Sequence, residues 1–216
     1  MRRRVLSFNR IKPLAFRESK NADLPEAING TPSGVAMRSG QESRNQAMSI
    51  QPLQGEFRIE PATERDVPVI LRMIKALAEY ERLSHAVVAT EAGLRAALFG
   101  PRPAAEVVIG YAGDEPAGFA VFFPSFSTFL GKPGLYLEDL FVEPRWRRRG
   151  LGRKLLKYVA GVAAARGCGR LEWAVLDWNE PAIEFYLGIG ATPLDEWTVF
   201  RLTGEGLSRL AERDEG

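Results

Sequence analysis

Residues 135–152, LYLEDLFVEPRWRRRGLG, constrain the fold more than any other segment. The first eight are mostly apolar, which is typical of a buried central strand. Glu138 and Asp139 interrupt that strand, where a carboxylate is costly unless it has a partner or a function. Pro144 ends the strand, and four arginines and two glycines then lead into an amphipathic helix. A glycine turn at a helix N-terminus is suited to bind an anion.

Composition describes an ordinary globular chain. The 216 residues, 45% of them hydrophobic, are enough for one domain with a sizeable core. The net charge of +2 is unevenly divided, because residues 1–55 hold nine Lys and Arg against four Asp and Glu, a surplus of +5. The rest of the chain is therefore acidic, and we expect no nucleic-acid partner. No apolar run approaches ~18 residues, so we also expect no membrane partner.

Two scarce residue types limit the chemistry. Cys168 is the single cysteine, which excludes an internal disulfide and indicates a reducing compartment, so we expect a cytoplasmic protein. His85 is the single histidine, which leaves little for a zinc site or a histidine-based triad. We expect no metal.

The chain divides near residue 55. Residues 1–55 are rich in Gly, Pro, Ser and Asn without a persistent period, which predicts a disordered N-terminal extension. An alternative is that the protein begins at Met48. Residues 56–216 form the predicted folded domain.

Hydrophobic periodicity and turn residues predict the elements of this domain. The expected strands are Glu56–Ala62, Val107–Tyr111, Ala117–Phe123, Leu135–Val142, Leu171–Leu176 and Trp197–Leu202. The expected helices run from Thr63 to near Arg82, from Thr90 to Gly100, from Gly152 to Gly167, from Pro181 to Gly190 and from Gly206 to Arg213. Ser125–Gly134 is expected to be a loop whose aromatics either form a lid or an oligomer contact or pack onto the core.

The glycine turn matches a known motif. Arg147-x-x-Gly150-x-Gly152 at a strand-to-helix turn is the [QR]-x-x-G-x-[GA] pattern of the GCN5-related N-acetyltransferases (GNAT). A dinucleotide fingerprint would require a glycine where Leu155 stands, and a P-loop would require a lysine where Arg153 stands. From Phe57 to about Leu202 the chain resembles the diamine acetyltransferase branch, which includes spermidine/spermine and thialysine acetyltransferases. The matching segments are RIEPATERD, ILRMIKALAEYE, LYLEDLFV, RRRGLG and WNEPAIEFYLGIGA.

The resemblance implies the α/β GNAT fold, a mixed twisted sheet of about six or seven strands with helices on both faces. It implies that strands 135–142 and 171–176 part to admit the pantetheine arm of acetyl-CoA. The implied cofactor-binding residues are Leu140, Phe141, Val142, Arg147, Arg148, Arg149, Gly150, Leu151, Gly152, Arg153, Asn179, Pro181 and Ala182. It also implies a homodimer.

The reaction logic starts from the acceptor, because an amine attacks a thioester only as the neutral base and a lysine-like nitrogen has a pKa near 10. By resemblance, Glu138 binds and deprotonates the amine through water, and Tyr186 is the general acid for the departing thiolate. Tyr80 and Glu81 are the matching substrate-binding pair. Residue type alone also allows Tyr186 to be a core aromatic, and it favours Asp139 as a buried structural partner of an arginine or a backbone amide.

We therefore expect acetyl-CoA-dependent transfer to a primary amine of a small cationic substrate by direct attack in a ternary complex. Polyamines, diamines and lysine-like amines all stay open, because Ser125–Gly134 differs from the diamine enzymes near the acceptor. The alternatives are a protein or peptide N-acetyltransferase, which shares the fold, and a non-catalytic acyl-CoA-binding module.

Overall fold

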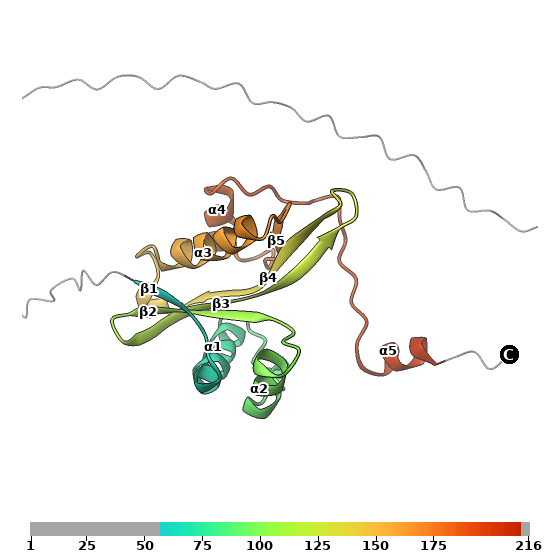
Figure 1. Ribbon diagram of the computed structural model, residues 1–216, viewed down its shortest axis with the longest axis horizontal. Helices are drawn as coiled ribbons and strands as arrows, with labels where there is room; N and C mark the ends of the chain where they lie inside the picture. The colour runs from blue at the N-terminus through green and yellow to red at the C-terminus, as the bar shows by residue number, and fades with distance from the viewer. Residues whose placement is uncertain (1–56, 213–216) are drawn as a thin grey trace, which may run out of the picture. The chain divides into compact units, whose positions relative to one another are not determined.

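The computed structural model describes residues 57–212 (Figure 1). The predicted extension and the alternative start at Met48 lie outside the described residues. The described strands are β1 (Arg58–Pro61), β2 (Glu106–Ala112), β3 (Glu115–Ser127), β4 (Lys132–Val142) and β5 (Leu171–Trp173). The α-helices are α1 (Val67–Tyr80), α2 (Glu91–Phe99), α3 (Leu151–Ala165), α4 (Glu180–Leu187) and α5 (Gly204–Ala211).

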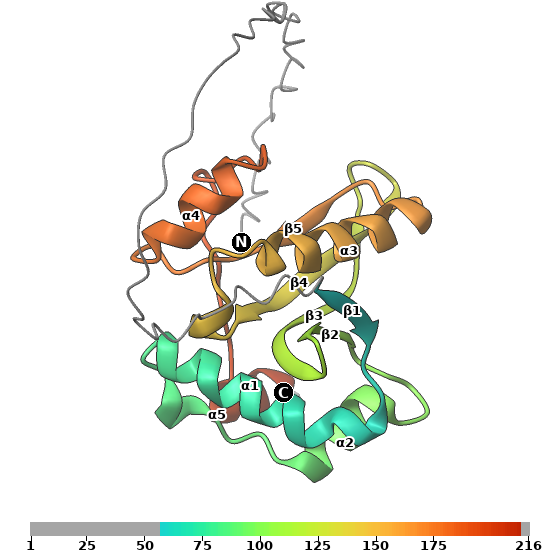
Figure 2. The same cartoon turned by 90° about the vertical axis from the view of Figure 1, so that its left-hand side faces the viewer.

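The five strands form one mixed sheet in the order β1-β2-β3-β4-β5. Neighbouring strands are antiparallel except β4 and β5, which are parallel because α3 forms the crossover between them. Helices α1 and α2 cover one face, and α3 and α4 cover the other (Figures 1 and 2). The predicted α/β class and mixed sheet are confirmed, although the described residues contain five strands rather than six or seven.

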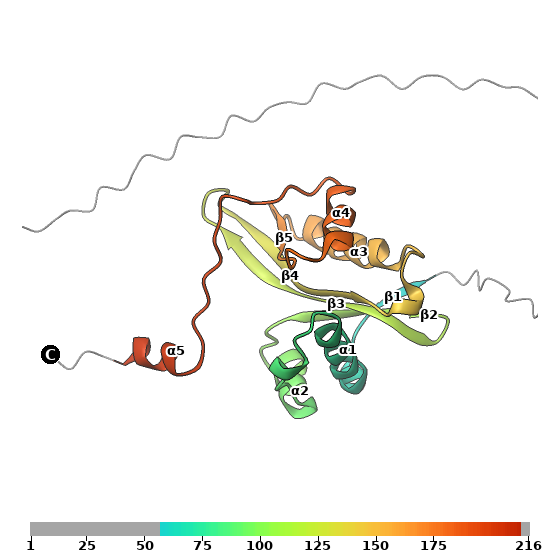
Figure 3. The same cartoon turned by 180° about the vertical axis from the view of Figure 1, so that it is seen from behind.

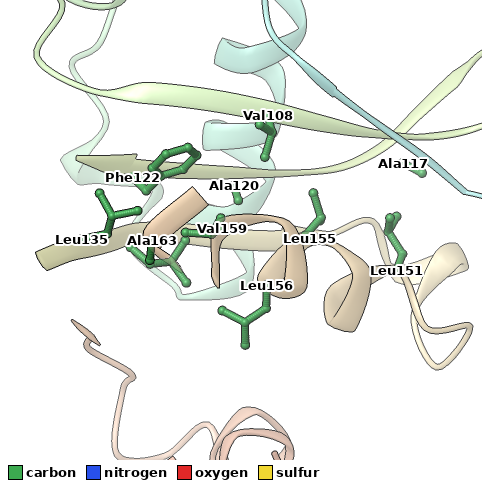
Figure 4. Packing of buried hydrophobic residues seen from close by; sticks show 11 residues of the cluster. Val108, Ala117, Ala120, Phe122, Leu135, Leu151, Leu155, Leu156, Val159 and Ala163 are labelled. Carbon is green, nitrogen blue, oxygen red and sulfur yellow. The ribbon is translucent and has the colours of Figure 1, made fainter. Parts of the chain in front are cut away.

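Apolar side chains pack on both faces of the sheet. On the α3 face, Leu155 and Val159 pack with Phe122 of β3, and all three are at most 1% exposed (Figure 4). On the α1 face, Ile70 and Met73 are fully buried against a second cluster that includes Phe119. The two layers hold the central strands rigidly, so side chains at the end of β4 are held in fixed positions.

The prediction of a strand at Trp197–Leu202 is wrong, because the structure forms no strand there. These residues form no ladder, and the side chains of Val199 and Phe200 are 84% and 90% exposed. The alternation of side chains is present in the sequence, but a strand requires a neighbour to bond its backbone, and this segment lies beside none. The predicted tail helix is present as α5.

The predicted loop Ser125–Gly134 is largely strand. The β3–β4 ladder continues through Ser125↔Gly134 to Ser127↔Lys132, which leaves only a short turn at 128–131. Gly131 has φ +60°, a conformation that glycine adopts without strain. Phe126 and Phe129 at this tip are 61% and 83% exposed, so the alternative of packing onto the core is wrong.

Candidate active site

The site lies where β4 and β5 part. Their ladder runs from Leu135↔Leu171 to Leu137↔Trp173 and stops, while β4 continues to Val142 paired with β3 only. The strands therefore separate as expected, and a cavity of about 670 Å³ opens beside the end of β4. It is lined by Leu77, Tyr80, Glu81, Glu138, Asp139, Leu140, Phe141, Val142, Arg147, Arg148, Gly150, Gly152, Arg153, Ala174, Val175, Leu176, Asn179, Pro181, Ala182, Glu184, Phe185 and Tyr186.

The glycine turn closes one end of this cavity. Gly150 is the N-cap of α3 with φ +88°, a left-handed conformation that disfavours any side chain. A Cβ built on Gly152 meets only Val142 Cγ2, at 3.7 Å. Packing within the chain therefore does not require glycine at 152, and the open space suits the approach of a bound group. The first turn of α3 presents backbone N–H groups without intrahelical partners to that space.

Two expected cofactor-binding residues do not line the cavity. Arg149 instead lies over the ring of Trp146, with its Cζ 5.1 Å from the centroid. The side chain of Leu151 is 1% exposed and belongs to the core on the α3 face. Helical periodicity predicts this burial, because Leu151 precedes Leu155 by one turn.

Arg147 is held by the end of β4 and by α1. Its Nε donates a hydrogen bond to the carbonyl oxygen of Val142 at 2.9 Å. Its Cζ lies 4.3 Å from the ring centroid of Tyr80, a cation–π contact. The first arginine of the motif thus connects the donor turn to the expected acceptor-binding tyrosine.

Tyr80 also reaches α4. Its hydroxyl donates to Asn179 Oδ1 at 3.0 Å, and its ring lies 5.9 Å from that of Trp178. Asn179 is the N-cap of α4, yet its side chain makes no capping hydrogen bond there. The amide side chain is used to bridge α4 to α1 instead.

A bulge in β4 places two carboxylates together. Val121 pairs with Asp139 and the next residue of β3 pairs with Leu137, so Glu138 has no partner in the ladder. Leu137 and Leu140 both pack on the α3 face although they are three residues apart, which shows that the bulge shifts the alternation. Both Glu138 and Asp139 therefore line the cavity, although strict alternation predicts opposite faces.

Asp139 is the more deeply placed of the two. Burial, together with Glu138 and Glu81, raises its pKa to about 6. Burial also raises the pKa of Glu81. The sequence favoured Asp139 as a buried partner of an arginine or a backbone amide. Within the described residues, neither kind of group pairs with it. Glu81, Glu138 and Asp139 instead form an acidic wall, and no Lys or Arg of residues 57–212 forms an ion pair with it.

Tyr186 completes the site. It lies on α4 with its ring 4.9 Å from that of Trp173 and 5.3 Å from that of Phe185, so it packs in part as a core aromatic. It also lines the cavity. Burial, with a smaller contribution from Glu81, raises its pKa to about 12, so the hydroxyl keeps its proton at neutral pH.

Comparison with known proteins decides the family. Residues 73–190 match the model of the acetyltransferase (GNAT) family. This chain belongs to that family. The chain is 41% identical to thialysine N-epsilon-acetyltransferase of Mus musculus, over 72% of this chain and 98% of the mouse protein. It is 36% identical to an L-ornithine N5-acetyltransferase of Arabidopsis thaliana, over 71% of this chain and 87% of the plant protein.

Solved structures agree with this GNAT assignment. An integron cassette protein from Vibrio cholerae has a TM-score of 0.62 and 27% identity, covering 73% of this chain and 98% of the other. An aminoglycoside acetyltransferase from a soil metagenome has a TM-score of 0.59 at 20% identity, covering 68% and 95% of the two chains, which shows the fold alone. The GNAT chain is an N-acetyltransferase, and enzymes of this family use acetyl-CoA as the co-substrate.

Several residues of the GNAT cavity were not predicted from the sequence. Leu77, Glu184 and Phe185 line it from α1 and α4, and Ala174–Leu176 line it after β5 ends. Helical spacing could have found the helix residues, because Leu77 lies three positions before Tyr80, and Glu184 and Phe185 lie three and four positions after Pro181. The segment 174–176 was expected to be strand, and its separation from β4 depends on tertiary structure.

Within residues 57–212 no group of three or more His, Cys, Asp or Glu could hold a metal ion. No helix in the same range is long and apolar enough to cross a membrane.

Proposed function

We propose that this enzyme transfers an acetyl group from acetyl-CoA to a primary amine of a small cationic substrate of the lysine-like or diamine class. One observation carries the proposal: an acidic wall of three carboxylates and a protonated tyrosine line the cavity whose other end is the Arg–Gly turn. The names of the mouse and plant relatives, which specify thialysine and ornithine, support the same class of acceptor.

The donor fits the Arg–Gly end of the cavity. Arg147, Arg148 and Arg153 line it and would pair with phosphate charge, and the N-terminus of α3 would supply backbone donors. The unpaired edge of β4 at Leu140–Val142 offers backbone groups to an amide-bearing arm, since β5 has left the ladder there. Acetyl-CoA supplies the activated acetyl group, and the chain supplies its position.

The carboxylates bind and activate the acceptor. Glu81, Glu138 and Asp139 repel one another when all are ionised, so a cationic amine relieves an unfavourable arrangement. Glu138 is the more exposed of the β4 pair, which favours it as the group that accepts the amine proton through water. Removing that proton frees the nitrogen lone pair for attack.

Tyr186 donates a proton to the leaving sulfur. A thiol has a pKa near 8.5, so a phenol at about 12 is a weak acid toward it. Bound cationic amine counters the field of Glu81, which lowers the pKa of Tyr186 toward a useful range. Cys168 does not line the cavity, which favours direct transfer in a ternary complex over an acyl-cysteine intermediate.

A thiol-release assay against lysine-like amines, diamines, polyamines and an N-terminal peptide tests this function. We expect turnover with a small diamine or lysine analogue. When both substrates are varied, the double-reciprocal plots of initial rate should intersect, as a ternary complex requires. Turnover restricted to the peptide would support the protein-acetyltransferase alternative. Acetyl-CoA binding without turnover on any amine would support the non-catalytic alternative, against which stands the presence of both Tyr186 and Glu138 in the cavity.

A further inference from the structure

The end of α1 holds an arginine in a backbone conformation that favours glycine. The amide of Arg82 donates to the carbonyl oxygen of Glu79 at 3.1 Å, and that of Leu83 donates to the carbonyl oxygen of Ala78 at 2.7 Å. This pair of hydrogen bonds is the Schellman motif, in which the residue after the C-cap adopts a left-handed conformation. Arg82 fills that position with φ +62°. Any side chain is disfavoured there, so the presence of an arginine points to a use for its guanidinium.

The guanidinium of Arg82 lies beside the acidic end of the cavity. Its Cζ is 5.5 Å from the ring centroid of Trp178, and that ring packs against Tyr80, which lines the cavity. Arg82 follows α1 and Trp178 precedes α4, and these two helices lie on opposite faces of the sheet (Figure 3). The contact therefore places a cation where the two layers meet, next in the chain to Glu81 of the acidic wall.

Arg82 has no anionic partner among the residues that the structure describes. Within residues 57–212 no Asp or Glu forms an ion pair with it, and its side chain is exposed. Other exposed arginines of the domain each pair with a glutamate, as Arg72, Arg145 and Arg166 do. A guanidinium held over an aromatic ring still offers N–H donors to a carboxylate, so Arg82 can bind an anion from outside the chain.

The charges at this end of the cavity match the head group of an amino acid. The proposed function leaves lysine-like amino acids and diamines open as acceptors, and these two classes differ by an α-carboxylate. The acidic wall would repel that carboxylate, so a cation beside the wall is needed to hold it. Glu81 and Arg82 are neighbours of opposite charge, like the α-ammonium and α-carboxylate groups that an amino acid carries on one carbon.

We propose that Arg82 binds the α-carboxylate of a basic amino acid whose side-chain amine accepts the acetyl group, and so selects amino acids over diamines of equal length. Glu81 beside it holds the α-ammonium group, which leaves Glu138 and Asp139 for the reacting amine. This inference rests on the proposed function, because it specifies the acceptor of the same site. Arg82 binds the substrate away from the reacting atoms, so it acts on the choice of acceptor rather than on the chemical step.

Two pairs of acceptors isolate the carboxylate: putrescine is ornithine without its carboxyl group, and cadaverine is lysine without it. Thiol release gives kcat/KM for each acceptor, and we expect the wild-type enzyme to favour the amino acid of a pair. Arg82→Gln should lower the ratio of amino acid to diamine about 10- to 100-fold, mainly through a higher KM for the amino acid, because one charge-assisted hydrogen-bonded pair is lost. Arg82→Lys should recover most of the ratio.

Two further variants separate recognition from a loss of charge or of stability. Lys75→Gln removes an exposed cation of α1 that does not line the cavity, and it should leave the ratio unchanged. Glycine fits the left-handed conformation without strain, so Arg82→Gly should unfold at a temperature no lower than the wild type while its ratio falls as in Arg82→Gln. If Arg82 only anchors Trp178, Arg82→Gln should instead lose activity equally with both members of a pair.

The same assay tells a failure of this inference from a failure of the proposed function. Turnover of both classes with a ratio that Arg82→Gln leaves unchanged would overturn the role of Arg82 and leave the proposed function standing. A wild-type preference for the diamine of each pair would do the same. Bound acetyl-CoA without turnover of any of the four amines would overturn both.

Discussion

The Tyr80 hydroxyl donates to Asn179 Oδ1 at 3.0 Å, which ties the end of α1 to the start of α4 across the cavity. The guanidinium of Arg147 lies over the same ring, with its Cζ 4.3 Å from the centroid. One tyrosine thus connects the donor turn, the acceptor side and the helix that carries Tyr186.

Tyr80→Phe tests this connection. It keeps the ring beneath Arg147 and removes the hydroxyl that donates to the side-chain oxygen of Asn179, so we expect the KM for the amine to rise about 5- to 10-fold, the cost of one hydrogen bond. The KM for acetyl-CoA should change much less. Steady-state kinetics with each substrate varied separates the two, and an unchanged amine KM would remove Tyr80 from acceptor positioning.

Tyr186→Phe tests the general acid. Loss of the hydroxyl should lower kcat about 10²- to 10³-fold while acetyl-CoA binding, measured by calorimetry, stays the same. Tyr111→Phe is a suitable control, because Tyr111 lies on β2 outside the cavity. Full turnover by Tyr186→Phe would exclude the residue from the chemical step.

Asp139→Asn tests the cost of the acidic wall. A carboxyl whose pKa is raised from 3.8 to about 6 favours the folded state fully below pH ~4 and loses that contribution as the pH rises through 6. At pH 8 the variant should therefore be more stable than wild type by about 2–3 kcal/mol, and the gain should shrink toward pH 4. Thermal unfolding at both pH values measures this, with Asp177→Asn as an exposed control. A gain independent of pH would contradict the electrostatic cause.

Arg153→Gln and Arg149→Gln form a matched pair for the donor site. Arg153 lines the cavity, whereas Arg149 lies over Trp146. We expect the first change to weaken acetyl-CoA binding about 10-fold or more and the second to have little effect, with the difference shrinking in high salt. Calorimetric titration with acetyl-CoA decides, and equal losses would place Arg149 at the phosphates after all.

The sequence predicted the helices and central strands well because their periodicity reports which face is buried. The residues that the motif placed at the donor turn also line the cavity, apart from Arg149 and Leu151. Asp139 was predicted less well. Residue type favoured a buried structural partner, but a bulge, which is set by the register with β3, turns Asp139 toward the cavity together with Glu138.

The sequence by itself determined the family, the mixed α/β fold and the glycine turn, because these depend on local spacing and on residue types that few other structures require. Only the tertiary structure decided which carboxylates meet in the cavity, where β4 and β5 part, and that Trp197–Leu202 lacks a neighbour. Those features depend on contacts between segments far apart in the chain. A strand in particular is completed only by the backbone that lies beside it.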